Sequence, residues 1–132
     1  MKSLVIAWIL FISVIALVAA DYIVLNNLIE DTKKELETIP GILTELEKSS
    51  KKEKSDIKKS LEKIENKWSD RETFLCLSLK HNVSREFMGY IVPAISYFKS
   101  KEYPEFLALI MSAKDTLDHI SFDEGIKLGN LL

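Results

Sequence analysis

The chain has 132 residues, with 18 Lys and Arg against 20 Asp and Glu, so its formal net charge is −2 at pH 7. This balance excludes the basic surface that nucleic-acid-binding domains carry, and a single cysteine excludes an internal disulfide. Four Gly, three Pro and no strand-like alternation argue against β-turn arrays. We expect an all-α fold, in which an N-terminal transmembrane helix leads into a small antiparallel helical bundle.

An apolar segment opens the chain, because residues 4–20 contain one polar side chain, Ser13. A helix of this length rises about 26 Å, close to the thickness of the hydrocarbon core of a bilayer. A signal peptide cleaved after Ala20 is the alternative, since small residues precede that position. The segment is longer than the usual apolar region of a signal peptide, which favours retention. We therefore expect a transmembrane anchor over residues 1–25 and a lipid bilayer as one partner.

The orientation of this anchor follows from its flanking charges. Lys2 and the amino terminus favour a cytoplasmic N-terminus. The predicted location is the cell membrane, with a single span and an extracytoplasmic C-terminal domain.

Residues 26–46 form the predicted stalk or first bundle helix. From residue 25 onward, apolar residues and one Thr recur at heptad spacing, and we expect them to pack against the rest of the bundle rather than on a second copy. These residues are Leu25, Ile29, Thr32, Leu36, Ile39, Leu43 and Leu46. Pro40-Gly41 should kink or break the helix. The oligomeric state stays open.

Residues 47–56 contain no apolar side chain and are predicted to be a charged linker. The bundle domain should then cover residues 57–132. Its first helix carries Ile57, Leu61, Ile64 and Trp68 at helical spacing, and Trp68 should anchor the core between helices. His81 should lie at the end of the helix that follows from this stripe.

Two further helices are predicted. Ser84 or Asn82 should cap the first of them, and Pro104 should lie near the start of the second. Ser121–Glu124 has a capping-box pattern that predicts a separate, short last turn. The expected core residues of the bundle are Trp68, Phe87, Ile91, Phe98, Phe106, Ile110 and Leu117.

Gly89 and Pro93 interrupt the apolar stripe of the first of these helices. Pro93 should bend or locally unwind the helix, because its ring clashes with the carbonyl group of Gly89 four residues earlier. A static kink is the first interpretation, and a hinge that opens the bundle toward a partner is the second.

No catalytic constellation is apparent. Cys76 and His81 would lie about 140° apart around a regular helix, and His119 after Asp118 is explained by capping of a helix end. Metal-binding motifs and a phosphate-binding glycine loop are absent from the sequence. We expect neither enzymatic activity nor a cofactor.

Several short motifs together resemble a small bacterial family, catalogued as domain of unknown function 4363. They are Trp68, "LSLKHN" around His81, "FMGYIVPAISYF", "LDHI" at 117–120 and the closing "LGNLL", which contains Asn130. Lys80 and Asn82 flank His81 where the family commonly has acidic residues. The resemblance implies a membrane-anchored helical protein of Gram-positive-type bacteria with no established activity. It also implies a small integral membrane protein as a partner.

The functional prediction is a membrane-anchored extracytoplasmic interaction module. It would dock a small integral membrane protein or an envelope component, without catalysis. A small-ligand sensor bundle acting through a partner is one alternative, and a secreted helical protein, cleaved after Ala20, is another. The candidate structural or interaction residues are Trp68, His81, Gly89, Pro93, His119 and Asn130.

Overall fold

The computed structural model describes residues 1–70 and 81–131, and of residues 81–83 and 120–131 it describes the backbone alone. All regular structure in these ranges is helical, which confirms the predicted class. The helices are α1 (Lys2–Glu37), α2 (Leu43–Lys48), α3 (Lys51–Asp70), α5 (His81–Lys99) and α6 (Tyr103–Leu131).

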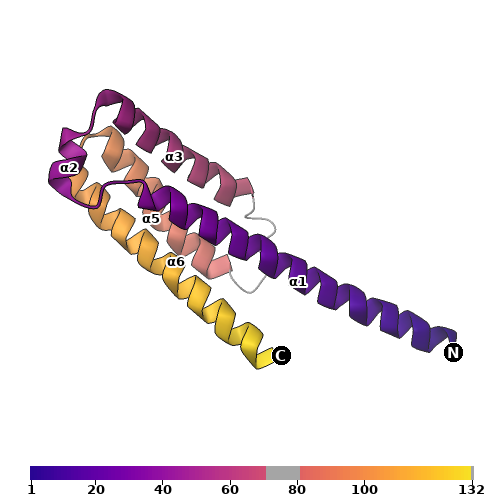
Figure 1. The fold of residues 1–132 in the computed structure, drawn as a ribbon. Coiled ribbons are helices and arrows are strands. Elements are labelled where there is room, and N and C mark those ends of the chain that lie inside the picture. The colour runs from indigo at the N-terminus through magenta and orange to yellow at the C-terminus, as the bar shows by residue number, and fades with distance from the viewer. Residues whose placement is uncertain (71–80, 132) are drawn as a thin grey trace.

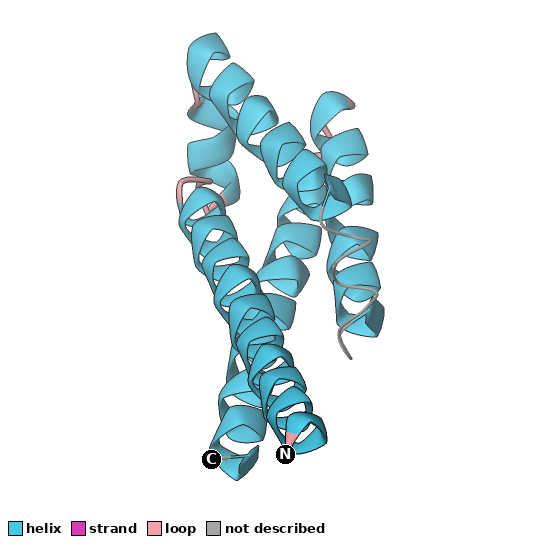
Figure 2. Ribbon diagram, turned by 90° about the vertical axis from the view of Figure 1, so that its right-hand side faces the viewer, coloured by secondary structure: helices cyan, strands magenta, loops and turns pink. Residues whose placement is uncertain are grey.

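The four long helices form an antiparallel bundle, in which each runs opposite to the next along the chain (Figure 1). The most extensive contact joins α5 and α6, while α1 packs on both α3 and α6. The short helix α2 closes one end of the bundle and contacts α6. The N-terminal part of α1 projects beyond the other end, where the C-terminal end of α6 also lies (Figures 1 and 2).

The predicted heptad seam of α1 and α2 faces the bundle. Six of its residues are buried and Leu43 is half-buried, which confirms packing within the chain. The break at Pro40-Gly41 is also confirmed, because α1 ends at Glu37 and α2 begins at Leu43. The breaks before and after α2 let α3 run back along α1 in the opposite direction (Figure 1).

The turn between α2 and α3 is shorter than the predicted linker 47–56. Only Ser49 and Ser50 lie outside the helices, and the remaining residues of the linker belong to α2 or α3. The Ser50 hydroxyl group accepts a hydrogen bond of 3.1 Å from the Glu53 backbone N–H. This bond caps the start of α3 and lets the helix begin directly after the turn.

One continuous core fills the bundle, and all seven predicted core residues are buried in it. The rings of Trp68 and Phe87 lie 4.3 Å apart between their centroids, which joins α3 to α5. Phe98 packs against Phe106 at 5.0 Å and so joins α5 to α6. Aromatic contacts thus connect three helices, with Trp68 as the predicted anchor.

The predictions for α5 are only partly met. Ser84 and Asn82 lie inside the helix rather than at its cap, since α5 as described begins at His81. The Ser84 side chain is buried. The helix also continues through Pro93 to Lys99, so the backbone is not unwound there.

The last helix begins as predicted, with Pro104 as its second residue. The prediction of a separate turn at Ser121–Glu124 is wrong, because α6 continues without a break to Leu131. A capping box stabilises a helix start only where the chain before it leaves the helix. Here the residues before Ser121 are already helical, so the pattern does not start a new helix.

Candidate functional site: the membrane anchor and its junction with the bundle

The N-terminal part of α1 is long and apolar enough to cross a membrane, and none of its most apolar stretch is buried. All side chains from Leu4 to Ala20 are exposed. Trp8 and Phe11 pack edge to face on this surface, with ring centroids 6.0 Å apart. Soluble proteins rarely expose a continuous apolar surface of this kind unless a membrane or a partner covers it.

Ser13 is the single polar side chain of this segment. Its hydroxyl group donates a hydrogen bond of 2.8 Å to the carbonyl oxygen of Ile9, one turn earlier. The donor is therefore satisfied within the helix itself. An unsatisfied polar group in the hydrocarbon core of a bilayer costs roughly several kcal/mol. This hydrogen bond therefore makes the Ser13 side chain compatible with a lipid environment.

The same helix passes from the exposed segment into the bundle without a break. Asp21 and Tyr22 are half-buried, and Leu25 is the first buried residue. From there the buried positions of α1 are those of the heptad seam together with the adjacent Leu28, so one face of the helix packs against the core. The apolar segment and the part of α1 that packs in the bundle thus belong to one continuous helix rather than to two units joined by a loop.

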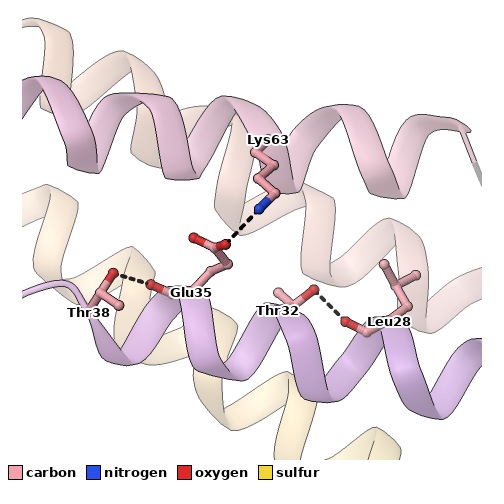
Figure 3. A network of polar contacts seen from close by, with 5 residues as sticks. All are labelled: Leu28, Thr32, Glu35, Thr38 and Lys63. Carbon is pink, nitrogen blue, oxygen red and sulfur yellow. Dashed lines mark hydrogen bonds and ion pairs between the residues drawn. The ribbon is translucent and has the colours of Figure 1, made fainter.

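A buried polar contact fixes α1 against α3. The Trp68 indole N–H donates a hydrogen bond of 2.9 Å to the Thr32 hydroxyl oxygen, and that hydroxyl donates one of 2.7 Å to the Leu28 carbonyl oxygen. Figure 3 shows the second of these bonds. Both side chains are almost fully buried, so the pair satisfies the polar groups that the core would otherwise leave unpaired.

One turn further along α1, Glu35 forms an ion pair with Lys63 of α3 (Figure 3). The Lys63 ammonium nitrogen lies 3.0 Å from the Glu35 carboxylate. This hydrogen bond lowers the pKa of Glu35 below 4.5, its ordinary value, and a hydrogen bond from Ser60 acts in the same direction. Partial burial of the carboxylate opposes the shift.

Further ion pairs join the other helices. Lys33 of α1 lies 3.3 Å from Asp118 of α6, and Lys99 of α5 lies 3.9 Å from Glu62 of α3. The Lys54 ammonium group lies 5.3 Å from the centroid of the Tyr103 ring. These contacts near the surface help to align the helices but add little to the free energy of unfolding, since such contacts stabilise by about 0–1 kcal/mol each.

The two histidines lie on the adjacent helices α5 and α6. His81 is the first described residue of α5, and its side chain is outside the described residues. The end of the preceding helix, where His81 was predicted to lie, falls on residues 71–80 and is also outside them. His119 lies within α6, where its Nδ1 donates a hydrogen bond of 2.8 Å to the Asp115 carbonyl oxygen. The prediction that His119 caps a helix end is wrong, because α6 continues for three further turns.

The remaining candidates are spread over the molecule. Trp68 is in the core, Gly89 is exposed, and Pro93 is half-buried in the same helix as Gly89. Asn130 lies near the end of α6, and its side chain is outside the described residues, as is Cys76 altogether. Within residues 1–70 and the described part of 81–131, no group of three or more His, Cys, Asp or Glu side chains could hold a metal ion.

Sequence reasoning missed the contacts between helices, although one signal for them was present. Thr32 is the only polar residue of the heptad seam, and a buried hydroxyl group requires a partner. Trp68 is a buried donor that requires an acceptor.

The chain matches no family model, no curated protein and no solved structure, so its resemblance to the bacterial family remains a prediction.

Proposed function

We propose that the chain is a membrane-anchored interaction module, whose helical bundle docks a small integral membrane protein or an envelope component. One observation carries the proposal: α1 is a single helix whose first half is apolar and exposed and whose second half is part of the core. A retained helix of this kind holds the bundle at a fixed place beside the bilayer. Docking needs only such positioning and a surface, and no catalytic group.

The proposed orientation places the N-terminus in the cytoplasm and the bundle outside it. Lys2 before the apolar segment supports this arrangement through the preference of cationic residues for the cytoplasmic side. A Met111→Cys variant in a Cys76→Ser background tests it, because Met111 is 66% exposed. We expect a membrane-impermeant maleimide to label intact cells, and labelling only after lysis would reverse the orientation.

The alternative of a small-ligand sensor finds less support in the bundle surface. A pocket beside Val24, Leu28 and Lys67 has a volume of about 170 Å³. Another, beside Pro40, has about 220 Å³. Pockets for drug-sized ligands typically measure about 300–1,000 Å³, and both of these pockets are smaller. In the described part of the bundle we therefore favour docking over small-molecule binding.

Retention of the anchor is tested on the chain as cells make it. We expect it to stay in the membrane pellet after a carbonate wash, and its intact mass to include residues 1–20. A soluble product beginning at Asp21 would show that the segment is a signal peptide and the bundle is secreted. The core would survive such cleavage, because every described buried residue lies at or after Leu25.

The docking partner is tested by photo-crosslinking in cells. Val92 of α5 and Met111 of α6 are exposed apolar side chains on the bundle, and each is replaced by a photoreactive residue. Lys51, which is exposed at the start of α3, is the matched control position. We expect a discrete membrane-protein adduct from at least one apolar position and not from Lys51. Adducts to lipid alone, or none at any position, would contradict docking.

A further inference from the structure

The C-terminal part of α6 extends past the bundle toward the end from which the anchor projects. Asp118 of α6 forms an ion pair with Lys33 of α1, which gives a common reference level on the two helices. Residues 119–131 continue the helix beyond that level. At 1.5 Å per residue, these thirteen residues add about 20 Å.

On α1, Lys33 of the same ion pair is the point from which the distance to the apolar segment is counted. Residues 21–32 separate Lys33 from Ala20, the last residue of the exposed apolar run. These twelve residues span about 18 Å of helix. The end of α6 therefore comes to nearly the same level along α1 as the boundary of the apolar segment.

The two views agree with this estimate. In Figure 1 the yellow end of α6 diverges from α1 and stops beside the projecting half of that helix. In Figure 2 both termini lie at the same end of the molecule. The end of α6 thus lies to one side of the anchor rather than on top of it.

We propose that the C-terminal end of α6, residues 126–131, contacts the lipid headgroups and forms a second membrane contact beside α1. This inference rests on the proposed function, because the boundary of the span defines where the headgroups are. The sequence after Glu124 supports it, since residues 125–132 contain Ile126, Leu128 and further leucines, one cation and no acidic residue. Apolar residues with a cation suit the headgroup region, where an acidic residue would be repelled by anionic lipids.

A second contact has a mechanical consequence for docking. One helix alone lets the bundle tilt and rotate about its own axis. Two contacts, separated sideways as in Figure 1, restrict both motions. The same face of the bundle would then always be presented to a partner in the membrane.

The test measures lipid contact along α6 in the full chain, reconstituted in phosphatidylcholine and phosphatidylglycerol vesicles. In a Cys76→Ser background, single cysteines at each of positions 128–131 receive an environment-sensitive fluorophore. Scanning consecutive positions makes the result independent of which side of the helix faces the lipid. Leu10→Cys reports the span, and Met111→Cys, exposed on the same helix but about 30 Å from its end, is the matched control.

Lipids that carry a quencher near the headgroups should reduce the emission from at least one of positions 128–131, and leave the Met111 label unchanged. A quencher deep in the acyl chains should reduce the emission from Leu10→Cys. Quenching at Leu10 with none at 128–131 would overturn the inference and leave the anchor intact. Equal quenching at Met111 would mean that the whole bundle lies on the membrane, which also overturns it. No quenching at Leu10 would contradict the proposed function itself. Circular dichroism of each labelled chain confirms that its helices are retained.

Discussion

The Trp68 indole N–H donates its hydrogen bond to the hydroxyl group of Thr32, thirty-six residues earlier, in the buried core of the bundle. This bond joins α3 to the helix that also carries the exposed apolar segment. Because a hydrogen bond needs a defined distance and angle, it fixes the rotation of α1 more sharply than apolar contacts do. That rotation also sets which side of the apolar segment, on the same continuous helix, faces each side of the bundle.

Replacing Thr32 by Val should therefore destabilise the bundle although the two side chains have nearly the same shape. The variant leaves the buried Trp68 N–H without its acceptor, at a cost of about 1–3 kcal/mol. Urea unfolding of the fragment that begins at Asp21, followed by circular dichroism, measures the change in the free energy of unfolding. That fragment keeps every described buried residue.

A double-mutant cycle separates this effect from loss of packing. In a Trp68→Phe background there is no N–H to satisfy, so Thr32→Val should cost much less. Equal costs in both backgrounds would show that the hydrogen bond contributes nothing to stability.

The ion pair of Glu35 and Lys63 should make the bundle more stable above about pH 4.5 than below it. The pKa of Glu35 is lowered in the folded state, so the unfolded chain binds its proton first as the pH falls. The stabilisation is therefore complete above the ordinary value of 4.5 and is lost as the pH falls through the lower, folded value. Glu35→Gln should remove this part of the pH dependence in urea unfolding measured between about pH 2 and 7.

Glu37→Gln is the matched control, because Glu37 lies on the same helix and is exposed. The control should keep the pH dependence of the natural chain. If Glu35→Gln and the natural chain lose stability in parallel as the pH falls, the ion pair is not the cause.

Replacing Leu117 by Ala should cost about 2–5 kcal/mol, because the side chain is fully buried and its loss leaves a cavity. Met111 lies on the same helix and is 66% exposed, so Met111→Ala should change the free energy of unfolding by less than about 0.5 kcal/mol. Both are measured by urea unfolding. A cost below about 1 kcal/mol for Leu117→Ala would mean that α6 does not pack here.

The helical class, the seam of α1 and α2 and the core of the bundle were predictable because each depends on local spacing. Residues such as Ile29 and Leu36 recur with the period of a helix, so burial of one implies burial of the other. The contact of Lys33 with Asp118 joins residues far apart in the chain. No local pattern contains such a pairing, since it follows from the order and direction in which the helices pack.

The errors at the helix ends have a different cause. Ser50 and Glu53 have the spacing of a capping box, and here the pattern does start a helix. Ser121–Glu124 has the same spacing and starts none. The difference lies in the residues before each pattern, because Ser49 has already left α2 with an extended backbone. A capping motif predicts a helix start only together with a preceding break.

Replacing Gly89 by Ala should stabilise the bundle by about 0.5–1 kcal/mol, because Gly loses more backbone entropy in a helix than Ala. Gly89 lies inside α5, and a Cβ atom built there meets no atom within 4 Å. Urea unfolding measures the gain. The variant also tests the hinge interpretation of Gly89 and Pro93, since a stiffer helix should then weaken crosslinking to a partner. Unchanged crosslinking with higher stability would leave Pro93 as a structural residue only.

At Lys101, in the turn between α5 and α6, a change to glycine should be stabilising. Lys101 has a φ of 61°, in the left-handed region that side chains disfavour. Its N–H donates to the Phe98 carbonyl oxygen at 3.1 Å, and the Glu102 N–H donates to that of Tyr97 at 2.9 Å. These bonds are those of a Schellman motif, in which glycine is preferred at the left-handed position.

Lys101→Gly should therefore raise the free energy of unfolding by about 0.5–1 kcal/mol, because relief of the strained φ outweighs the greater flexibility of the unfolded chain. Lys99→Gly is the matched control and should destabilise by about 1 kcal/mol, since Lys99 is still within α5. Both changes remove one positive charge, and Lys99→Gly also removes the exposed ion pair with Glu62, which contributes about 0–1 kcal/mol. The opposite signs of the two changes, rather than their exact difference, therefore report the backbone. If both variants lose stability to the same extent in urea, the left-handed turn at Lys101 does not form in solution.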